Sequence, residues 1–195
     1  MCAALASPVT GGHEARPAPQ FKFRVKDIQG VGHGSGEWQG KKAAVFFFVA
    51  LECPISAGYS AEIRRIAGQY AGAGFIFYAV VSDPTVRASR ATRRRFRDFG
   101  YDFPVLLDGE QTLAKRLLIE VTPEVAVVSP AGELLYRGRI DDRFVSLGKY
   151  RDKPTRQDLR ITLDAIAAGH TPPARSAPAV GCYLPEAPKH RRNYE

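Results

Sequence analysis

The chain has 195 residues, of which 45% are hydrophobic, which suffices for one domain with a substantial core plus tails. No apolar stretch reaches the roughly 18 residues of a membrane-spanning helix, so none is predicted. Much of the net charge of +8 comes from the six arginines of Arg87–Arg97 and from the tail sequence His190-Arg191-Arg192. The first cluster is typical of a solvated helix face, or of a surface for an acidic partner. No nucleic-acid-binding motif accompanies it, so we expect no nucleic-acid partner.

Residues 1–20 contain Gly, Pro and Ser without periodicity, and we predict that this segment is disordered. Within it, Ala4-Leu5-Ala6 followed by Ser7-Pro8 resembles the small-residue end of a secretory signal peptide, although the charged and apolar segments that should precede it are absent. The likeness is either the remnant of a signal peptide or chance in an Ala-rich segment. We expect an exported protein, with a cytoplasmic location not excluded.

The next segments predict strands and a helix in alternation. Phe21–Val25 alternates apolar and basic residues as a half-buried strand does, and Lys41–Leu51 is apolar throughout, as in the middle of a sheet. Apolar residues recur at helical spacing over Pro54–Tyr70, and Gly72 and Gly74 follow. Phe75–Val81 reads as a second buried strand.

The second half begins with two further predicted helices and ends in a hairpin and a last helix. We expect helices over Thr85–Phe99, Glu110–Ile119 (with Leu113, Leu117 and Leu118 inward) and Thr155–Ala168, and extended segments at Phe103–Leu107, Glu124–Ser129 and Glu133–Ile140. Early strand–helix–strand units require parallel pairing, and the hairpin adds an antiparallel pair. The order predicts an α/β fold with a mixed central sheet and helices on both faces. Residues 21–169 form the domain, and residues 170–195 form an irregular Pro-rich tail.

Three cysteines occur, namely Cys2, Cys53 and Cys182, and no pair has zinc-finger spacing. Cys53 stands between a buried strand and a helix start, and Pro54 suits the first helical position. The N–H groups and dipole at a helix N-terminus stabilise a thiolate and lower its pKa. Cys53 is therefore either an activated nucleophile or a small buried hydrophobe.

Four segments in order resemble the thioredoxin-like superfamily, in its redoxin (AhpC/TSA-like) thiol-disulfide oxidoreductase branch, over Phe21–Ala168. They are Cys53-Pro54 at a helix start, Ser82-Asp83 after a strand, Phe103–Asp108, and Thr122-Pro123 before a strand. The resemblance implies a thiol-disulfide oxidoreductase with Cys53 as nucleophile, substrate binding by Pro54, Thr122 and Pro123, and a cis Pro123. The alternative for Pro123 is an ordinary strand-initiating proline. The resemblance implies no cofactor, and a protein disulfide or a small thiol reductant as partner.

At some positions the sequence differs from the motifs of these families, and the differences limit which redox reactions Cys53 is expected to carry out. Thioredoxins carry Cys-X-X-Cys, but Ser56 occupies the second position here and cannot resolve a mixed disulfide. Phe46 and Ala50 stand where peroxiredoxins carry Pro and Thr or Ser, which puts a peroxidase pocket in doubt, although a sulfenic acid on Cys53 would allow peroxide reduction.

Cys182 is the candidate resolving cysteine, because the apolar residues around it can dock the tail; the alternative is a stray cysteine. A second reading is a binding module without turnover, or a Cu(I) chaperone that uses Cys53 and Cys182 as soft ligands. Glu52 beside Cys53 is either a proton acceptor during exchange or a solvated carboxylate.

Overall fold

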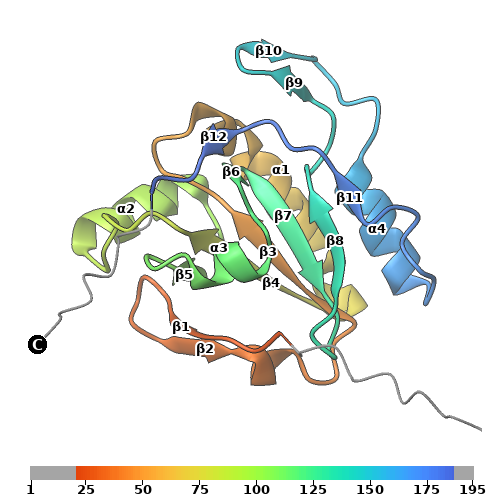
Figure 1. Ribbon diagram of the computed structural model, residues 1–195, viewed down its shortest axis with the longest axis horizontal. Helices are drawn as coiled ribbons and strands as arrows, with labels where there is room; N and C mark the ends of the chain where they lie inside the picture. Colours follow the sequence, from red (N-terminus) through yellow and green to blue (C-terminus); the bar gives the residue numbers. More distant parts are fainter. Residues whose placement is uncertain (1–20, 187–195) are drawn as a thin grey trace, which may run out of the picture.

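The computed structural model describes residues 21–186, which are built around a six-stranded sheet (Figure 1). The strand order is β11-β8-β7-β3-β4-β5. The bounds are β3 Ala43–Phe48, β4 Phe75–Val81, β5 Val105–Leu107, β7 Glu124–Val128, β8 Leu134–Gly138 and β11 Ser176–Ala177. Strands β3, β4 and β5 are parallel, whereas β7 is antiparallel to both β3 and β8. The predicted mixed sheet is confirmed.

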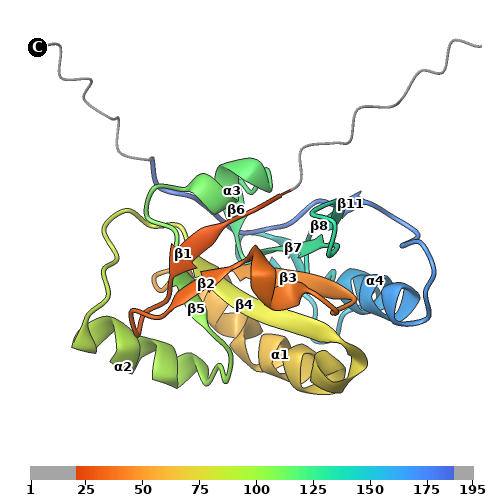
Figure 2. The same ribbon diagram turned by 90° about the horizontal axis from the view of Figure 1, so that it is seen from below.

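Helices lie on both faces of the sheet (Figure 2). They are α1 Pro54–Tyr70, α2 Arg90–Phe99, α3 Thr112–Arg116 and α4 Asp158–Ala167, with short 3-10 helices η1 Ser35–Trp38 and η2 Ala71–Ala73. Apolar residues of α1, α2 and α4 belong to one core cluster, and those of α3 and η1 belong to the other. No helix within residues 21–186 is long and apolar enough to cross a membrane.

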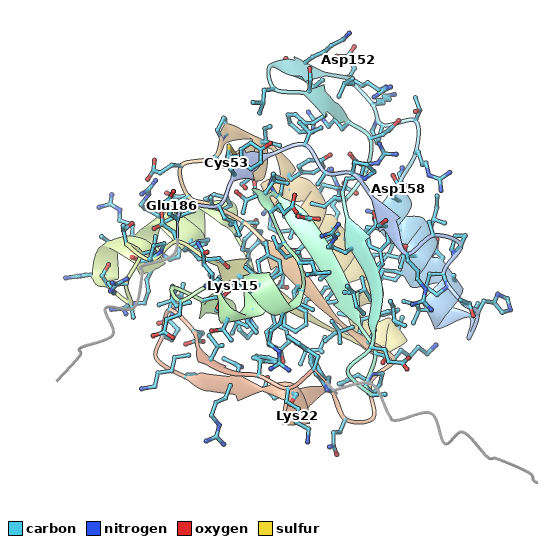
Figure 3. All side chains as sticks on the ribbon, in the orientation of Figure 1. Lys22, Cys53, Lys115, Asp152, Asp158 and Glu186 are labelled. Atoms are coloured by element: carbon cyan, nitrogen blue, oxygen red, sulfur yellow. A yellow bond between two sulfur atoms is a disulfide. The ribbon has the colours of Figure 1, made fainter. Side chains whose placement is uncertain are left out.

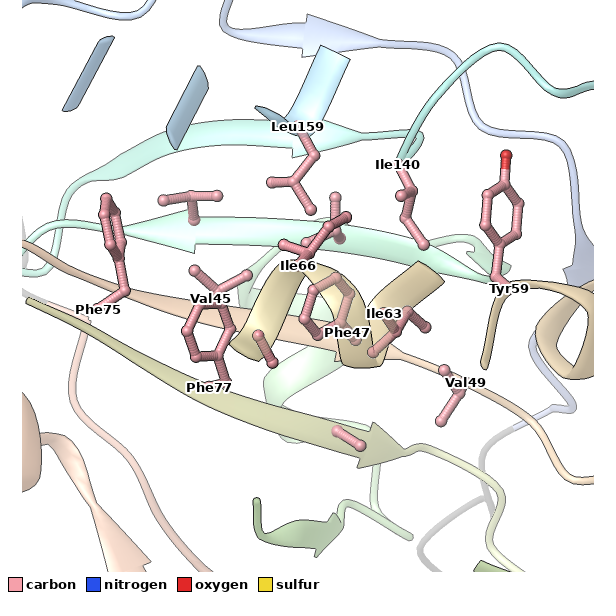
Figure 4. Close-up of a cluster of buried hydrophobic side chains, with 14 of the residues drawn as sticks. Val45, Phe47, Val49, Tyr59, Ile63, Ile66, Phe75, Phe77, Ile140 and Leu159 are labelled. Atoms are coloured by element: carbon pink, nitrogen blue, oxygen red, sulfur yellow. The ribbon is translucent and has the colours of Figure 1, made fainter. Parts of the chain in front are cut away.

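The two clusters follow from strand geometry, because successive side chains of a strand point to opposite faces of the sheet. Val45 and Phe47 of β3 pack toward α1 and α4, together with Phe75 and Phe77 of β4 (Figure 4). Phe46 of β3 packs on the opposite face. Central strands covered on both faces are apolar throughout, which is why the apolar runs Lys41–Leu51 and Phe75–Val81 predict strands.

Three two-stranded pairs surround the sheet. They are β1 Arg24–Lys26 with β2 Gly32–Gly34, β9 Phe144–Ser146 with β10 Lys149–Tyr150, and β6 Val121–Thr122 with β12 Cys182–Tyr183. The first pair joins the sheet edge, where Asp27 bridges to Leu106 of β5. The third pair joins the tail to the segment that precedes Pro123.

Three helix predictions were wrong in their limits. The α4 helix begins at Asp158 rather than Thr155, because the Thr155 and Arg156 N–H groups donate to the Asp142 carboxylate. The α2 helix begins at Arg90 rather than Thr85, because Asp83 closes a turn onto the Thr85 N–H and Ser89 caps the helix by accepting from the Thr92 N–H at 3.0 Å. The α3 helix ends at Arg116. Leu118 was expected inward, but it has φ +59° and is 60% exposed, because the chain turns out of the helix there.

The tail is irregular apart from two short strands, β11 at Ser176–Ala177 and β12 at Cys182–Tyr183, which the sequence does not predict. The β11 strand runs parallel to β8, and the Arg139 N–H donates to the Ala177 carbonyl at 3.0 Å. A Cβ at Gly138 would lie 2.0 Å from that same carbonyl oxygen, so the close approach needs glycine. The predicted disorder of residues 1–20 lies outside the described residues.

Candidate active site

Cys53 is the N-cap residue of α1, and Pro54 occupies the first helical position, as the sequence predicts. The backbone at Cys53 is extended (φ −89°, ψ 114°), and its carbonyl accepts the first helical bond from the Ala57 N–H at 3.1 Å. Only 2% of the residue is exposed. The sulfur therefore lies at the N-terminus of a 17-residue helix, which is the positive end of the helix dipole, and it is almost fully shielded from solvent.

Cys53 and Cys182 form a disulfide across 129 residues of chain. Their Cα atoms are 6.1 Å apart, within the range that a disulfide spans. Cys53 lies beside β12, near the start of α1 (Figure 3). Cys182 is partly exposed, whereas Cys53 is buried. The structure thus joins the two cysteines that the sequence offered as nucleophile and resolving thiol.

The segment at Thr122-Pro123 lies against the disulfide, and its peptide bond is cis. The Cys53 sulfur is 3.2 Å from the carbonyl oxygen of Thr122. A disulfide sulfur carries no proton, so this is a packing contact in the oxidised protein, and the reduced thiol is placed to donate a hydrogen bond there. That bond would favour the thiol, whereas the helix N-terminus favours the thiolate, so the two act in opposite directions.

The tail covers the same segment as a strand. Cys182 pairs with Thr122 and Tyr183 pairs with Val121 in antiparallel register. The Thr122 hydroxyl donates to the Cys182 carbonyl at 3.4 Å, and the Leu184 N–H donates to the Glu120 carbonyl at 3.1 Å. The contact is therefore a backbone ladder as well as a covalent bond.

Ser56 has a structural role in this site. Its side chain is fully buried, and its hydroxyl oxygen accepts from the Ala50 N–H at 3.2 Å. This bond ties the loop before Cys53 to the first turn of α1. The position that holds the second cysteine of a Cys-X-X-Cys motif is here used to fix the loop, which leaves Cys182 as the partner of Cys53.

Glu52 is held by an arginine of α2. Its side chain is 79% exposed and forms an ion pair with Arg95, with the Arg95 Nη1 2.6 Å from the Glu52 Oε1. The hydrogen bond and charge of Arg95 lower the pKa of Glu52. A more acidic carboxylate is a weaker base, so this geometry does not support proton transfer by Glu52. That role stays a prediction.

Glu124, which sequence reasoning did not single out, directly follows Pro123. It is 5% exposed, its Oε2 accepts from the Glu120 N–H at 3.1 Å, and its Oε1 lies 3.6 Å from the Arg137 Nε. Burial raises the pKa of Glu124, although the backbone bond and Arg137 oppose this. Glu124 also lines a small pocket together with tail residues of Ser176–Ala179. The available signal was a carboxylate at the start of an otherwise apolar strand.

The arginine cluster is partly used within the protein. Arg93 donates to the Ile28 carbonyl at 3.2 Å, and Arg95 pairs with Glu52, whereas Arg90, Arg94 and Arg97 are exposed. An acidic partner for this face stays a prediction. Within residues 21–186, no group of three His, Cys, Asp or Glu side chains is arranged to hold a metal ion. Both sulfurs are committed to the disulfide, and copper binding by Cys53 and Cys182 stays a prediction.

The central sheet with helices on both faces, the cysteine at the start of α1 and the cis-proline segment beside it define a thioredoxin-like protein. The chain belongs to the Redoxin family, whose pattern matches residues 14–147. A comparison with curated proteins gives no match.

Solved structures share this fold over most of the chain. A hypothetical protein from Sinorhizobium meliloti 1021 is 27% identical with a TM-score of 0.73, covering 84% of this chain and 90% of its own. An uncharacterized conserved protein from Geobacillus kaustophilus is 24% identical with a TM-score of 0.76, covering 95% and 100%. A secreted Mycobacterium tuberculosis disulfide oxidoreductase, homologous to Escherichia coli DsbE, is 16% identical with a TM-score of 0.51, covering 75% and 95%.

Proposed function

We propose that this protein is a thiol-disulfide oxidoreductase in which Cys53 is the nucleophile and Cys182 is the resolving cysteine. One observation carries the proposal: Cys53 at the start of α1 is joined to Cys182 beside Thr122. Membership of the Redoxin family supports the same chemistry. Disulfides persist in oxidising compartments, and a similar fold occurs in a secreted oxidoreductase, so we further propose an extracytoplasmic location.

The reaction starts from the reduced protein. The Cys53 thiolate attacks one sulfur of a substrate disulfide, a mixed disulfide forms, and the second substrate sulfur leaves as a thiolate. The Cys182 thiolate then attacks the Cys53 sulfur and releases the first substrate sulfur. The substrate gains two electrons and the protein ends with the Cys53–Cys182 disulfide. An external thiol pair restores the reduced protein.

Thr122, Pro123 and Pro54 have supporting roles in this proposal. The backbone of Thr122 holds the chain that carries the attacked sulfur, as it holds Cys182 in the oxidised protein. Pro123 separates β7 from Thr122, whose carbonyl oxygen lies 3.2 Å from the Cys53 sulfur. Pro54 occupies the first position of α1, where a backbone N–H would have no partner within the helix, and so fixes the helix start next to Cys53.

A single-turnover experiment tests the proposal. Pre-reduced protein is mixed with a peptide pair joined by one disulfide, and the products are followed by intact mass. All variants carry Cys2→Ser so that only Cys53 and Cys182 report. The parent protein should reduce about one disulfide per chain and end oxidised, because the second thiolate is within the same chain.

The cysteine variants give the decisive comparison. Cys182→Ser should stop as a covalent adduct with one peptide, and Cys53→Ser should neither reduce the substrate nor form an adduct. Release of both peptides by Cys182→Ser at the parent rate would contradict the resolving role. Substrate reduction by Cys53→Ser would contradict the nucleophile role. A parallel arm with hydrogen peroxide asks whether Cys53 also forms a sulfenic acid that Cys182 condenses with.

A further inference from the structure

The tail residue before Cys182 is Gly181, and it lies in direct backbone contact with Thr122. A Cβ built at Gly181 would be 2.3 Å from the Thr122 carbonyl oxygen and 2.6 Å from its carbonyl carbon. Backbone atoms cannot yield as the end of a flexible side chain can, so only glycine fits unless the strand shifts. The backbone at Gly181 does not require glycine for its φ angle, so space alone sets the requirement.

The residues after Cys182 are constrained differently. The Tyr183 side chain is 82% exposed, so the site places little restriction on which residue stands at this position. Leu184 packs against the core cluster that contains α3, and the Gln111 side chain donates to the Pro185 carbonyl at 2.5 Å. The strand edge at Val121–Thr122 thus holds a cysteine between a required glycine and a preferred apolar residue two positions later.

We propose that the Val121–Thr122 edge is a binding site for extended polypeptides of the type Gly-Cys-X-apolar, and that residues 181–184 occupy it as an attached competitor in the oxidised protein. This inference rests on the proposed function, because it names the substrate class of the same site. Reduction of the Cys53–Cys182 bond removes the covalent link, so an external segment of the same pattern takes the place of β12 and presents its sulfur to Cys53.

The chemistry of capture conserves electrons. The Cys53 thiolate attacks the sulfur of a peptide cysteine that is already in a disulfide, the new Cys53–peptide disulfide forms, and the other sulfur leaves as a thiolate. The proton of the Cys53 thiol goes to solvent. The edge adds backbone hydrogen bonds that place this peptide sulfur next to Cys53, which is the mode of recognition by strand addition.

Synthetic peptides with the sequence of residues 177–186 test the selectivity. Their cysteine is activated as a thionitrobenzoate disulfide, and release of thionitrobenzoate is timed with the full chain carrying Cys2→Ser and Cys182→Ser. The native peptide is compared with peptides carrying Gly181→Ala or Tyr183→Ala. We expect the Gly181→Ala peptide to react about 10- to 100-fold more slowly, because the shifted strand misplaces the sulfur, and Tyr183→Ala within about twofold.

A second protein variant tests competition by the tail. Adding Gly181→Ala to the Cys182→Ser chain should expel the tail from the edge, so the native peptide should react faster than with Cys182→Ser alone. Equal rates for the native and Gly181→Ala peptides with both proteins would overturn the selectivity and leave the proposed function intact. Failure of Cys53 to react with the thionitrobenzoate disulfide of free cysteine would instead overturn the proposed function.

Discussion

The sulfur of Cys53 lies 3.2 Å from the carbonyl oxygen of Thr122, although 69 residues separate the two in sequence. Thr122 also pairs with Cys182, so one residue contacts both ends of the disulfide. A tail strand that adds to the edge beside a nucleophilic cysteine combines two functions in one contact. The strand covers Cys53 in the oxidised protein, and it holds the Cys182 sulfur next to the Cys53 sulfur, where the resolving step takes place.

The disulfide should contribute strongly to stability, because it closes a loop of 129 residues and restricts the unfolded chain. The chain-entropy treatment gives about 5 kcal/mol, so we expect reduction to lower the free energy of unfolding by about 3–5 kcal/mol. Urea denaturation of oxidised and reduced protein measures this. Cys182→Ser should have the same free energy of unfolding as the reduced parent, whether reductant is present or absent. A Cys182→Ser variant as stable as the oxidised parent would contradict the expectation.

Ser56 should be needed for stability rather than for exchange. Ser56→Ala leaves the partly buried Ala50 N–H without its acceptor, which should cost about 1–3 kcal/mol. Ser60→Ala is the matched control, because the Ser60 hydroxyl bonds the Ala57 carbonyl at a solvent-accessible site. Urea denaturation reports both variants. Equal stability of the two would mean that the Ser56 bond does not hold the loop before Cys53.

Gly138 should tolerate no side chain, because a Cβ there would lie 2.0 Å from the carbonyl oxygen of Ala177 and 2.8 Å from the backbone nitrogen of Ala177. We expect Gly138→Ala to detach β11 and to lower the free energy of unfolding by about 2–4 kcal/mol. Gly68 of α1 has open space around its Cα, so Gly68→Ala should be neutral or stabilising by up to about 1 kcal/mol. Matching losses in the two variants would contradict the close approach of β8 and β11.

His33 should make stability depend on pH. It lies between Asp27 and Glu37, 3.2 Å and 3.1 Å from their carboxylates. Burial opposes the charged ring, but the hydrogen bonds to Glu37 and Asp27 outweigh it and raise the pKa of His33 above 6.5. A raised pKa in the folded protein gives stabilisation that is complete below pH 6.5 and is lost as the pH rises through the folded value.

We therefore expect His33→Gln to lower the free energy of unfolding more at about pH 6 than at about pH 9. Urea denaturation at the two pH values measures the difference, and His170→Gln at an exposed position serves as the control. If His33→Gln lowered the free energy of unfolding equally at both pH values, folding would not favour the protonated form of the His33 ring.

The sequence was informative where periodicity or capping determines structure. The apolar runs of β3 and β4, the helical spacing of α1 and the Cys53-Pro54 cap each depend on residues close in the chain. The two-residue strands β11 and β12 have no such pattern, because they form only by pairing with β8 and β6. The space that excludes a side chain at Gly181, and the ion pair that draws Glu52 to Arg95, likewise arise from contacts between distant segments.

The most direct test of the central claim is intact mass after thiol labelling of the air-oxidised and the reduced protein, in a Cys2→Ser background. The parent should be lighter by two hydrogens when oxidised, and it should take up label at Cys53 and Cys182 only after reduction. Either Cys53→Ser or Cys182→Ser should abolish the mass difference. Free labelling of both cysteines after oxidation would contradict the Cys53–Cys182 redox pair.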